Sequence, residues 1–550
     1  MADALTPRSR RPCVAVLGNG PVGQTTALLL ARWGIQVTIL EARLARDSIG
    51  SKAICQQRDV MEIWDAVGVG RRVADEGVTW ERARTFYRNQ ELFERTFADR
   101  VASTFPAFVN ISQARTEELL DEQIGHTDLV DVRWGHTVEH VVQDEGGTVV
   151  TCSTSTGPVT VEADYCVVAL GSRAGSIREQ LGISFDGRSF DDRFLICDIH
   201  ADLPGWETER RFYFDPEWNP GRQVLIHPCP ESMFRIDWQV PADYDLDAEE
   251  RDGRLDARIR CIIGDVEYHV MWKSVYRFHS RLASRFRVGR LLLAGDAAHI
   301  VSPFGARGLN SGVADADNAA WKLAFVLRGW ADETLLDTYH DERHAAAQEN
   351  IDITTRTMDF LVPQNQVQAE RRERLLAAAT CDPAVWPQVD SGRLAEPFWY
   401  VASPLTTPDP TRPFTGRPDH GSVPTPAPGI LVPDVPIDVD MHGRQRLRQI
   451  ARAAGLLVLT GDLLDVDAVN RTASAATAVD VNVHAIADID ATGELTRALK
   501  PGSDEVWIIR PDAYIAAVIT FDDPRVFVAA LRRAIGQTRV DLNRPRSVTA

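Results

Sequence analysis

The chain has 550 residues, of which 78 are acidic and 60 are basic, so its formal net charge is −18. A chain of this length is expected to form about three domains with large cores. The acidic balance argues against nucleic acid or an anionic membrane as the main partner, but it says little about a small buried substrate. The eight cysteines show neither Cys-x-x-Cys nor zinc-ligand spacing, so we predict no metal site and expect free thiols in a reducing compartment.

A glycine-rich motif, GNGPVG at 18–23, lies near the start of the chain. The apolar run 14–17 before it predicts a strand, and Pro21 suits the first turn of a helix, where a missing N–H costs nothing. Glycines at this spacing allow a tight turn, close approach of a pyrophosphate, and packing of helix on strand. A second predicted strand, 37–40, ends at Glu41, where dinucleotide-binding folds place a carboxylate on a ribose. We therefore predict a Rossmann-like unit for an adenine dinucleotide, either NAD or FAD.

No secretory apolar segment precedes this strand. The apolar stretch 14–31 is interrupted by glycines and a proline, so it predicts neither a leader nor a membrane span. We expect a cytoplasmic protein.

Short alternating runs between 190 and 286 predict an inserted β-sheet. In 234–239, apolar residues alternate with Arg235, Asp237 and Gln239, which predicts a strand with one buried face and one face that is wet or lines a cavity. A sheet inserted between two halves of a cofactor domain is expected to form the substrate wall, because ligand pockets favour domain interfaces.

A second glycine motif, GDAAH at 295–299, follows the apolar run 291–294, which predicts a buried strand. The loop continues to Asn310, and a helix is expected beyond it, because apolar residues recur at spacings of three and four until Gly329. An NAD dehydrogenase has no evident use for this second loop. FAD needs donors for its ribityl and flavin end, so the two motifs together favour FAD.

The C-terminal third is expected to hold a separate α/β unit. Helical patterns run from 335 to 380, and the proline-rich stretch 397–436 predicts an ordered connector or linker. Predicted strands and a closing helix then alternate, at 456–459, 481–487, 506–509 and 524–535. No cysteine follows Cys381, so dithiol chemistry is excluded here.

These motifs resemble those of the FAD-dependent aromatic hydroxylases, the class A flavoprotein monooxygenases, and within them the branch of 3-(3-hydroxyphenyl)propionate hydroxylase and the phenol hydroxylases. The resemblance rests on 18–41, QARTE at 113–117, 289–310, and LLDTY at 335–339 with Glu342-Arg343. The family's third domain is thioredoxin-like, and 509–514 resembles part of it.

The resulting prediction is an α/β protein. It has a split Rossmann-like FAD-binding domain (1–189 and 287–380, the latter with helices), an inserted β-sheet substrate domain (190–286), a proline-rich connector (381–436) and a thioredoxin-like C-terminal domain without a dithiol (437–550).

The resemblance implies that FAD lies along both motifs. Glu41 would hold the adenosine ribose, and Gln113 and Asp296 would contact the pyrophosphate and ribityl chain. Backbone amides near Leu309 and Asn310 would meet the flavin ring. Lys52 stands where the family usually has an arginine near the flavin, so the charge is kept but not the planar fork. The expected FAD-binding residues are Gly18, Gly20, Pro21, Val22, Gly23, Glu41, Ala42, Lys52, Gln113, Gly295, Asp296, Gly308, Leu309 and Asn310.

The resemblance also implies the reaction. NADH or NADPH would reduce the flavin, which would react with molecular oxygen to a 4a-hydroperoxide and hydroxylate a small, phenolic aromatic compound. The expected pocket lies between the flavin loop at Pro303 and the inserted sheet, where Arg235 would anchor a carboxylate and Tyr213 or Tyr276 would relay the phenolic proton. The competing interpretation is that these residues only complete the sheet and that Arg235 pairs with Asp237 or another acid. A monomer or homodimer is expected.

Other functions stay open at this stage. One is epoxidation of, or oxygen insertion into, a polyketide-type or other non-phenolic substrate. Another is a flavoprotein oxidoreductase without hydroxylase activity, a flavin-binding protein, or an NAD dehydrogenase.

The sequence departs from the family after the predicted strand 166–170. The family carries an Asp-Gly pair there, which is linked to FAD and nicotinamide handling, whereas this chain reads GSRAGSIR at 171–178. Arg178 is kept and the aspartate is missing. We therefore expect weak binding of the nicotinamide cofactor.

Overall fold

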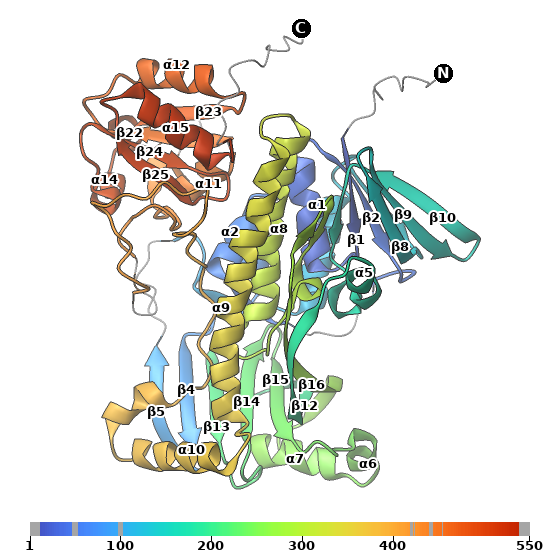
Figure 1. Ribbon diagram of the computed structural model, residues 1–550. Coiled ribbons are helices and arrows are strands. Elements are labelled where there is room, and N and C mark those ends of the chain that lie inside the picture. Colours follow the sequence, from blue (N-terminus) through green and yellow to red (C-terminus); the bar gives the residue numbers. More distant parts are fainter. Residues whose placement is uncertain are drawn as a thin grey trace. The chain divides into compact units, whose positions relative to one another are not determined.

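The computed structural model describes residues 12–46, 53–96, 103–418, 422, 424–438, 444–453 and 455–537. The chain divides into two compact units. Unit 1 comprises residues 1–100, 104–317 and 343–396, and unit 2 comprises residues 101–103, 318–342 and 397–550. Both units mix helices and strands, which confirms the predicted α/β class (Figure 1).

A six-stranded sheet organises the first part of unit 1, in the order β17-β18-β11-β1-β2-β7. β1 pairs in parallel with both β11 and β2, and every residue of β1 and β11 is buried, as expected for apolar runs in a parallel sheet. The strands predicted at 14–17, 37–40 and 291–294 are confirmed to within one residue. The bounds are β1 Cys13–Leu17, β2 Gln36–Glu41, β7 Val130–Trp134, β11 Tyr165–Val168, β17 Arg287–Val288 and β18 Leu291–Leu293.

Short helices pack around this sheet. α1 begins at Pro21, as predicted, and its Gln24 side-chain amide donates to the Glu117 carbonyl of α4 at 2.9 Å, which fixes the two helices against each other. Ser112 caps α4 by accepting a hydrogen bond from the Arg115 N–H. The helices are α1 Pro21–Arg32, α2 Arg58–Asp65, α3 Gly70–Glu76, α4 Gln113–Ile124 and α5 Gly175–Gln180, and a two-stranded sheet pairs β3 Cys55–Gln57 with β6 Phe108–Asn110.

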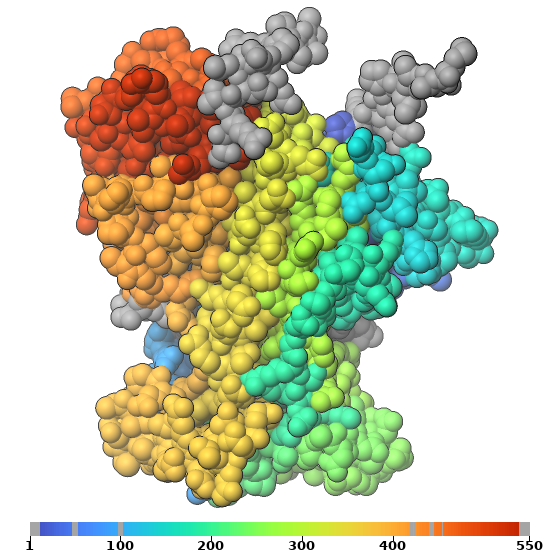
Figure 2. All heavy atoms as spheres, viewed as in Figure 1, coloured from blue at the N-terminus to red at the C-terminus, as the bar shows by residue number. Residues whose placement is uncertain are grey.

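A small antiparallel sheet, β10-β9-β8, has one largely exposed face. Figure 2 shows its atoms, coloured cyan to teal, at the surface of unit 1. Its strands are β8 Thr137–Asp144, β9 Gly147–Thr154 and β10 Gly157–Ala163.

The inserted sheet has eight strands in the order β19-β16-β12-β15-β14-β13-β4-β5. β4 and β5 lie outside the range 190–286, and β4 joins the sheet by pairing in parallel with β13. One face is apolar, with Ile226, Ile236 and Trp238 packed against Ile259 of α7. The bounds are β4 Arg82–Tyr87, β5 Gln90–Thr96, β12 Phe185–Ala201, β13 Glu209–Phe214, β14 Gln223–Cys229, β15 Met233–Val240, β16 Tyr268–Ala283 and β19 His299–Ile300, with α6 Leu246–Arg251 and α7 Arg254–Ile263.

Two long helices, α8 and α9, lie side by side (Figure 1). Within unit 1 they are joined by Arg343, whose Nε donates to Asp315 Oδ1 at 2.7 Å, and by Arg307, which donates to Asn350 at 2.6 Å. The helical region predicted at 335–380 is split near Pro363. The helices are α8 Arg307–Leu327, α9 Asp337–Leu361 and α10 Gln366–Ala379.

Unit 2 contains a four-stranded mixed sheet in the order β23-β22-β24-β25. That this domain is thioredoxin-like stays a prediction. Much of the proline-rich stretch belongs to its core, since Tyr400, Ile430 and Val432 are buried there. The elements are β20 Pro436–Asp438, β21 Arg444–Arg446, α11 Leu447–Ala453, β22 Leu456–Thr460, α12 Val466–Ala476, β23 Val481–Ala485, α13 Ile486–Ile489, α14 Glu494–Leu499, β24 Glu505–Ile509, β25 Ile515–Thr520 and α15 Pro524–Ala534.

A buried ion cluster ties the segments of unit 2 together. Arg510 donates to both carboxylate oxygens of Glu342 and also binds Asp512, while Lys322 donates to Glu342 at 2.7 Å. The positive charges hold the pKa of Glu342 well below its usual range, although burial acts in the opposite direction. Among the described residues, no helix is long and apolar enough to cross a membrane.

Candidate functional site

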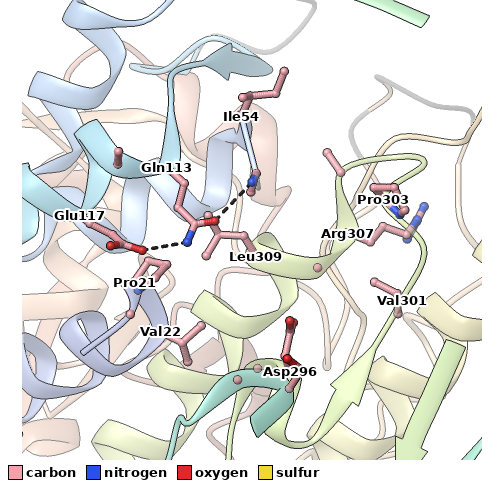
Figure 3. Close-up of a pocket in the computed structure, with 18 of the residues that line it drawn as sticks. Pro21, Val22, Ile54, Gln113, Glu117, Asp296, Val301, Pro303, Arg307 and Leu309 are labelled. Atoms are coloured by element: carbon pink, nitrogen blue, oxygen red, sulfur yellow. Dashed lines mark hydrogen bonds between the residues drawn. The ribbon is translucent and has the colours of Figure 1, made fainter. Parts of the chain in front are cut away.

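A cavity of about 920 Å³ joins the two glycine motifs to the inserted sheet. All residues that line it belong to unit 1. In Figure 3, Pro21 and Val22 of the first motif lie on one side of the cavity, Pro303 and Arg307 of the second loop lie on the other, and Leu309 lies between them.

The three glycines of the first motif have different physical roles. Gly18 has a φ of +107°, and an added Cβ would lie 2.5 Å from the Ala169 carbonyl oxygen. At Gly23 an added Cβ would lie 2.0 Å from the Gly18 carbonyl oxygen, so this residue packs helix on strand and does not line the cavity. At Gly20 a Cβ would meet nothing within 4 Å, so the backbone there faces open cavity at the start of α1. This is the space that a pyrophosphate on a helix N-terminus requires.

Glu41 lies at the end of β2 and lines the cavity together with Ala42 and Arg43. Its Oε2 accepts from the Asn19 N–H at 2.9 Å, and its Oε1 accepts from the Arg43 N–H and guanidinium at 2.9 and 3.0 Å. Burial opposes ionisation, but these hydrogen bonds lower the pKa of Glu41. The residue is therefore a fixed, charged acceptor, as binding of a ribose diol requires.

The middle of the cavity carries polar groups from three segments. Gln113 donates to Glu117 at 2.8 Å and accepts from the Ala53 N–H at 3.3 Å (Figure 3). Asp296 lies in a single 3₁₀ turn, Gly295–Ala297, and lines the cavity next to Gly295. Lys52 lies outside the described residues.

The Gly295-Asp296 turn is held from behind by Asp315 of α8. Asp315 Oδ2 accepts from the Gly295 N–H at 2.9 Å and lies 2.7 Å from His299 Nε2, while Oδ1 accepts from Arg343. Burial opposes ionisation of Asp315, but His299 and Arg343 lower its pKa. The histidine of the GDAAH motif thus supports the turn from a buried position, since it is 1% exposed.

The loop before α8 forms the far wall. Pro303, Phe304, Gly308 and Leu309 line the cavity, and Ala306 has a left-handed φ of +55°. The Arg307 guanidinium fixes the loop by donating to the carbonyl oxygens of residues 393 and 394. The loop therefore presents the N-terminus of α8 towards the cavity, which favours negative charge there.

The side chain of Asn310 is held by hydrogen bonds within the chain, while the flavin contact expected of the backbone amides near Leu309 and Asn310 stays a prediction. It does not line the cavity; its amide donates to the Cys55 and Ala306 carbonyls, and its Oδ1 accepts from the Gln57 N–H at 3.0 Å. This side chain ties the flavin loop to β3.

Five strands of the inserted sheet present alternate residues to the cavity. Because Cβ atoms alternate between faces, the apolar partners Phe234, Ile236 and Trp238 point into the opposite core, as the sequence pattern predicts. The sheet residues that line the cavity are Ile196, Arg210, Leu225, His227, Arg235, Asp237, Trp272 and Tyr276.

The structure corrects the expected position of Tyr213. Its ring stacks on Phe86 with centroids 4.5 Å apart and packs against Trp218, on the face away from the cavity. Tyr276 and Arg235 do line the cavity, but Arg235 forms a two-point ion pair with Asp198, at 2.7 and 2.8 Å. The ion-pair partner of Arg235 is therefore Asp198 and not Asp237.

Arg210 was missed by the sequence interpretation. Side chains alternate between the two faces of β13, so Arg210 shares a face with Phe212 and Phe214, and Arg211 lies on the opposite face. This alternation was the signal that could have identified Arg210. The Gly171 loop also lines the cavity, whereas Arg178 is buried and donates to the Ala297 carbonyl at 2.9 Å. Arg178 therefore supports the second motif.

The residues present fit FAD. The open backbone at Gly20, the fixed carboxylate of Glu41 and a second helix N-terminus at Arg307 all line one cavity, and these are the groups that a dinucleotide and its ring system require.

Comparisons with known proteins agree. A family model described as "FAD binding domain" matches residues 12–354, and a second, "Aromatic-ring hydroxylase, C-terminal", matches residues 425–538. Two similar relatives are named 3-(3-hydroxy-phenyl)propionate/3-hydroxycinnamic acid hydroxylase. The one from Mycolicibacterium smegmatis is 29% identical over 68% of this chain and 65% of its own length, and the one from Comamonas testosteroni is 29% identical over 68% and 62%. The chain therefore aligns with less than two thirds of the length of these relatives.

Solved structures match over more of the chain. The flavin-dependent monooxygenase PieE, solved with FAD and substrate, has a TM-score of 0.84 at 25% identity and covers 97% of this chain and 100% of its own. Aklavinone-11 hydroxylase has a TM-score of 0.77 at 24% identity over 96% and 100%, which supports the fold. The predicted resemblance to FAD-dependent aromatic hydroxylases is confirmed by these matches, and the chain belongs to the FAD-binding domain family.

Proposed function

We propose that the protein is a FAD-dependent monooxygenase that uses NADH or NADPH and molecular oxygen to hydroxylate a small phenolic compound. The observation that supports this most is the continuity of the cavity, because FAD-binding features and a sheet wall with isolated polar groups share one space. A dehydrogenase that binds only NAD would not need the second motif and the wall together.

The roles of the chain's residues follow from their positions. Gly20 and the start of α1 would hold the pyrophosphate, Glu41 the adenosine ribose, and Gln113 and Asp296 the centre of FAD. The loop from Pro303 to Leu309 would hold the ring system with backbone amides at a helix N-terminus. When bound, FAD would supply the redox chemistry, namely hydride acceptance from the nicotinamide and activation of oxygen.

Exclusion of water is the second task of the cavity. Trp80, Phe304 and Leu394 line it, and Phe304 is itself locked by edge contacts with Phe194 and Phe278. Apolar walls at this position would protect activated oxygen from unproductive loss.

The names of the relatives suggest the first substrates to test, 3-(3-hydroxyphenyl)propionate and 3-hydroxycinnamate.

We also infer a reducing, cytoplasmic compartment. All eight cysteines lie in the described part of the chain and all are free. Burial raises the pKa of Cys166 to about 12, so this thiol is unreactive.

The test is substrate-stimulated turnover. The purified protein, loaded with FAD, should consume NADH or NADPH faster when one of the phenolic probes is added, and mass spectrometry should detect the hydroxylated product. Flavin-loaded protein that consumes NAD(P)H at an unchanged rate with every probe and forms no product would contradict the proposal.

A further inference from the structure

Four ionisable side chains gather on the sheet wall of the cavity: Arg210, His227, Arg235 and Asp237. The strand register makes them neighbours. His227 of β14 lies directly opposite Arg235 of β15, and Asp237 follows two residues later on the same face. Side chains directly opposite each other in a sheet have Cβ atoms about 5 Å apart.

Arg235 is the one member of this group whose charge is already balanced. Asp198 of β12 lies opposite it in the register and takes both of its donors in a two-point pair. A guanidinium held in this way has little left to offer a ligand. Arg235 therefore serves the wall and not the substrate.

Asp237 and His227 carry polar atoms without a partner. Asp237 Oδ1 and His227 Nδ1 are both buried and accept or donate no hydrogen bond among the described residues. Buried polar atoms are normally paired, so unpaired ones at a cavity indicate a missing ligand group.

Arg210 completes the arrangement. It is 5% exposed, and its guanidinium donates to the Ser391 carbonyl at 3.0 Å. No acidic side chain among the described residues forms an ion pair with it. Burial lowers the pKa of Arg210 to about 10, so it stays charged at neutral pH and offers the cavity a positive charge that no ion pair occupies.

The pKa values of Asp237 and His227 agree with a proton transfer to Asp237. Burial raises the pKa of Asp237 to about 7, against the opposing effect of Arg235 and Arg210, while Asp198 raises it further. Burial, together with Arg210 and Arg235, lowers the pKa of His227 well below 6.5, so this ring is neutral. Trp272 and Tyr276 face the group from β16, and the thiol of Cys55 lines the cavity from β3.

We propose that this wall binds the substrate through a phenolic hydroxyl, that Asp237 accepts the phenol proton, and that Arg210 holds the resulting phenolate. This inference rests on the proposed function and names the ionised phenol as the form in which the substrate is bound. The phenol O–H bond breaks, an O–H bond forms on Asp237 Oδ1, and the electron pair stays on the phenolate oxygen. The neutral ring of His227 forms a further hydrogen bond, either with the phenolate oxygen or with the Asp237 side chain.

Charge balance supports this assignment. With Asp237 ionised, the two arginines and the two aspartates of the wall sum to zero, so a neutral phenol can enter without burying net charge. After the transfer, the wall gains one positive charge and the substrate carries one negative charge. A carboxylate head group would instead add a net negative charge to the ionised wall, which burial disfavours.

The experiment uses 7-hydroxycoumarin, a phenol whose neutral and ionised forms absorb at different wavelengths. FAD-loaded wild-type protein is titrated with it at neutral pH, where the free probe is mainly the neutral phenol. The difference spectrum gives its ionisation, and calorimetry in two buffers of different ionisation enthalpy gives the protons released. We expect the phenolate spectrum with fewer than one proton released per probe bound, because ionised Asp237 takes up the proton.

Three variants sharpen the test. Asp237→Asn should bind the neutral phenol, Arg210→Gln should weaken binding at least tenfold and lose the phenolate band, and Arg210→Lys should restore part of both. Arg211→Gln is the matched control, because Arg211 lies on the same strand but pairs with Glu209 and stacks on Trp206, away from the cavity. It should bind the probe as the wild type does. Each variant is compared at equal FAD content.

Wild-type protein that binds no probe, binds the neutral phenol, or releases a full proton to the buffer would overturn the inference. So would an Asp237→Asn variant that still binds the phenolate without releasing a proton. If these results occur while phenols still stimulate NAD(P)H consumption, the proposed function survives and the assignment of the wall fails. If phenols do not stimulate NAD(P)H consumption but the phenolate spectrum of the bound probe is present, the assignment of the wall survives and the proposed function fails.

Discussion

Asp315 is expected to couple the stability of unit 1 to FAD binding. Its carboxylate accepts the Gly295 N–H and the Arg343 Nε and lies 2.7 Å from His299 Nε2, and it is fully buried. In Asp315→Asn the side chain keeps its shape but loses the charge and one acceptor oxygen, and its new NH₂ group faces a donor. We expect the second motif to lose its anchor.

The magnitude follows from these contacts. Each hydrogen bond to a charged group contributes about 1.5–3 kcal/mol, and removal of one partner from a buried pair costs about 3–5 kcal/mol because the other charge is left uncompensated. Arg343 keeps its bonds to Ser311, so we expect Asp315→Asn to lower the free energy of unfolding by about 3–5 kcal/mol and not more. FAD affinity should fall with it, because the Gly295-Asp296 turn is no longer fixed.

The assay is urea unfolding followed by tryptophan fluorescence, with FAD content measured separately. Asp131→Asn is the matched control, since Asp131 makes a surface pair with Arg133 and its side chain is 59% exposed; its effect should stay within about 0.5 kcal/mol. The pKa of Asp315 is lowered from 3.8 in the folded protein, so its contribution is present above that value and is lost as the pH falls below it. An Asp315→Asn variant with full FAD content and wild-type stability would refute the reasoning.

Three further predictions concern other parts of the chain. Gly20→Ala should fold normally but bind FAD more weakly in equilibrium dialysis, because the new methyl group enters only cavity space. Gly23→Ala should instead lower the melting temperature, because its Cβ would lie 2.0 Å from the Gly18 carbonyl oxygen. Equal behaviour of the two variants would contradict this. Asp237→Asn should be more stable than wild type at alkaline pH, by up to about 4 kcal/mol. Because the pKa of Asp237 is raised to about 7 in the folded protein, its protonated side chain makes a stabilising contribution that is fully present below 3.8 and is lost as the pH rises through 7. If the urea midpoints of variant and wild type differ equally at acid and alkaline pH, the prediction is wrong. Arg510→Met should destabilise unit 2 by about 3–5 kcal/mol, since buried Asp512 loses its ion-pair partner and Glu342 keeps Lys322 but loses Arg510. Limited proteolysis should cut this unit faster, while Arg525→Met, with a side chain 91% exposed, should leave the cutting rate unchanged.

Local sequence was sufficient for the FAD-binding half of the cavity. The strand, the glycines and the helix start lie within one short run, so the position of Pro21 at the start of α1 and of Glu41 at the end of β2 follows from neighbours in the chain. The alternation at 234–239 likewise placed Arg235 and Asp237 on the cavity face.

Contacts between distant segments could not be predicted from local sequence patterns. The partner of Arg235 lies 37 residues away on β12, and β13 is set in phase by β4, which lies more than a hundred residues earlier. Because a shift of one residue exchanges the faces of a strand, Tyr213 was placed on the cavity side and Arg210 was not considered. The support of the second motif by Asp315 and Arg343 joins residues 28 apart on two helices, and no local pattern marks it.

Incorporation of labelled oxygen tests the central claim most directly. FAD-loaded protein is incubated with NAD(P)H, ¹⁸O₂ and the phenol that stimulates cofactor consumption, and the product is analysed by mass spectrometry. The account predicts a product that carries one ¹⁸O atom on the aromatic ring, formed by wild-type protein and lost in Gly20→Val, whose side chain would occupy the pyrophosphate space. A product oxygen that comes from water, or labelled product formed equally well by protein without FAD, would contradict it.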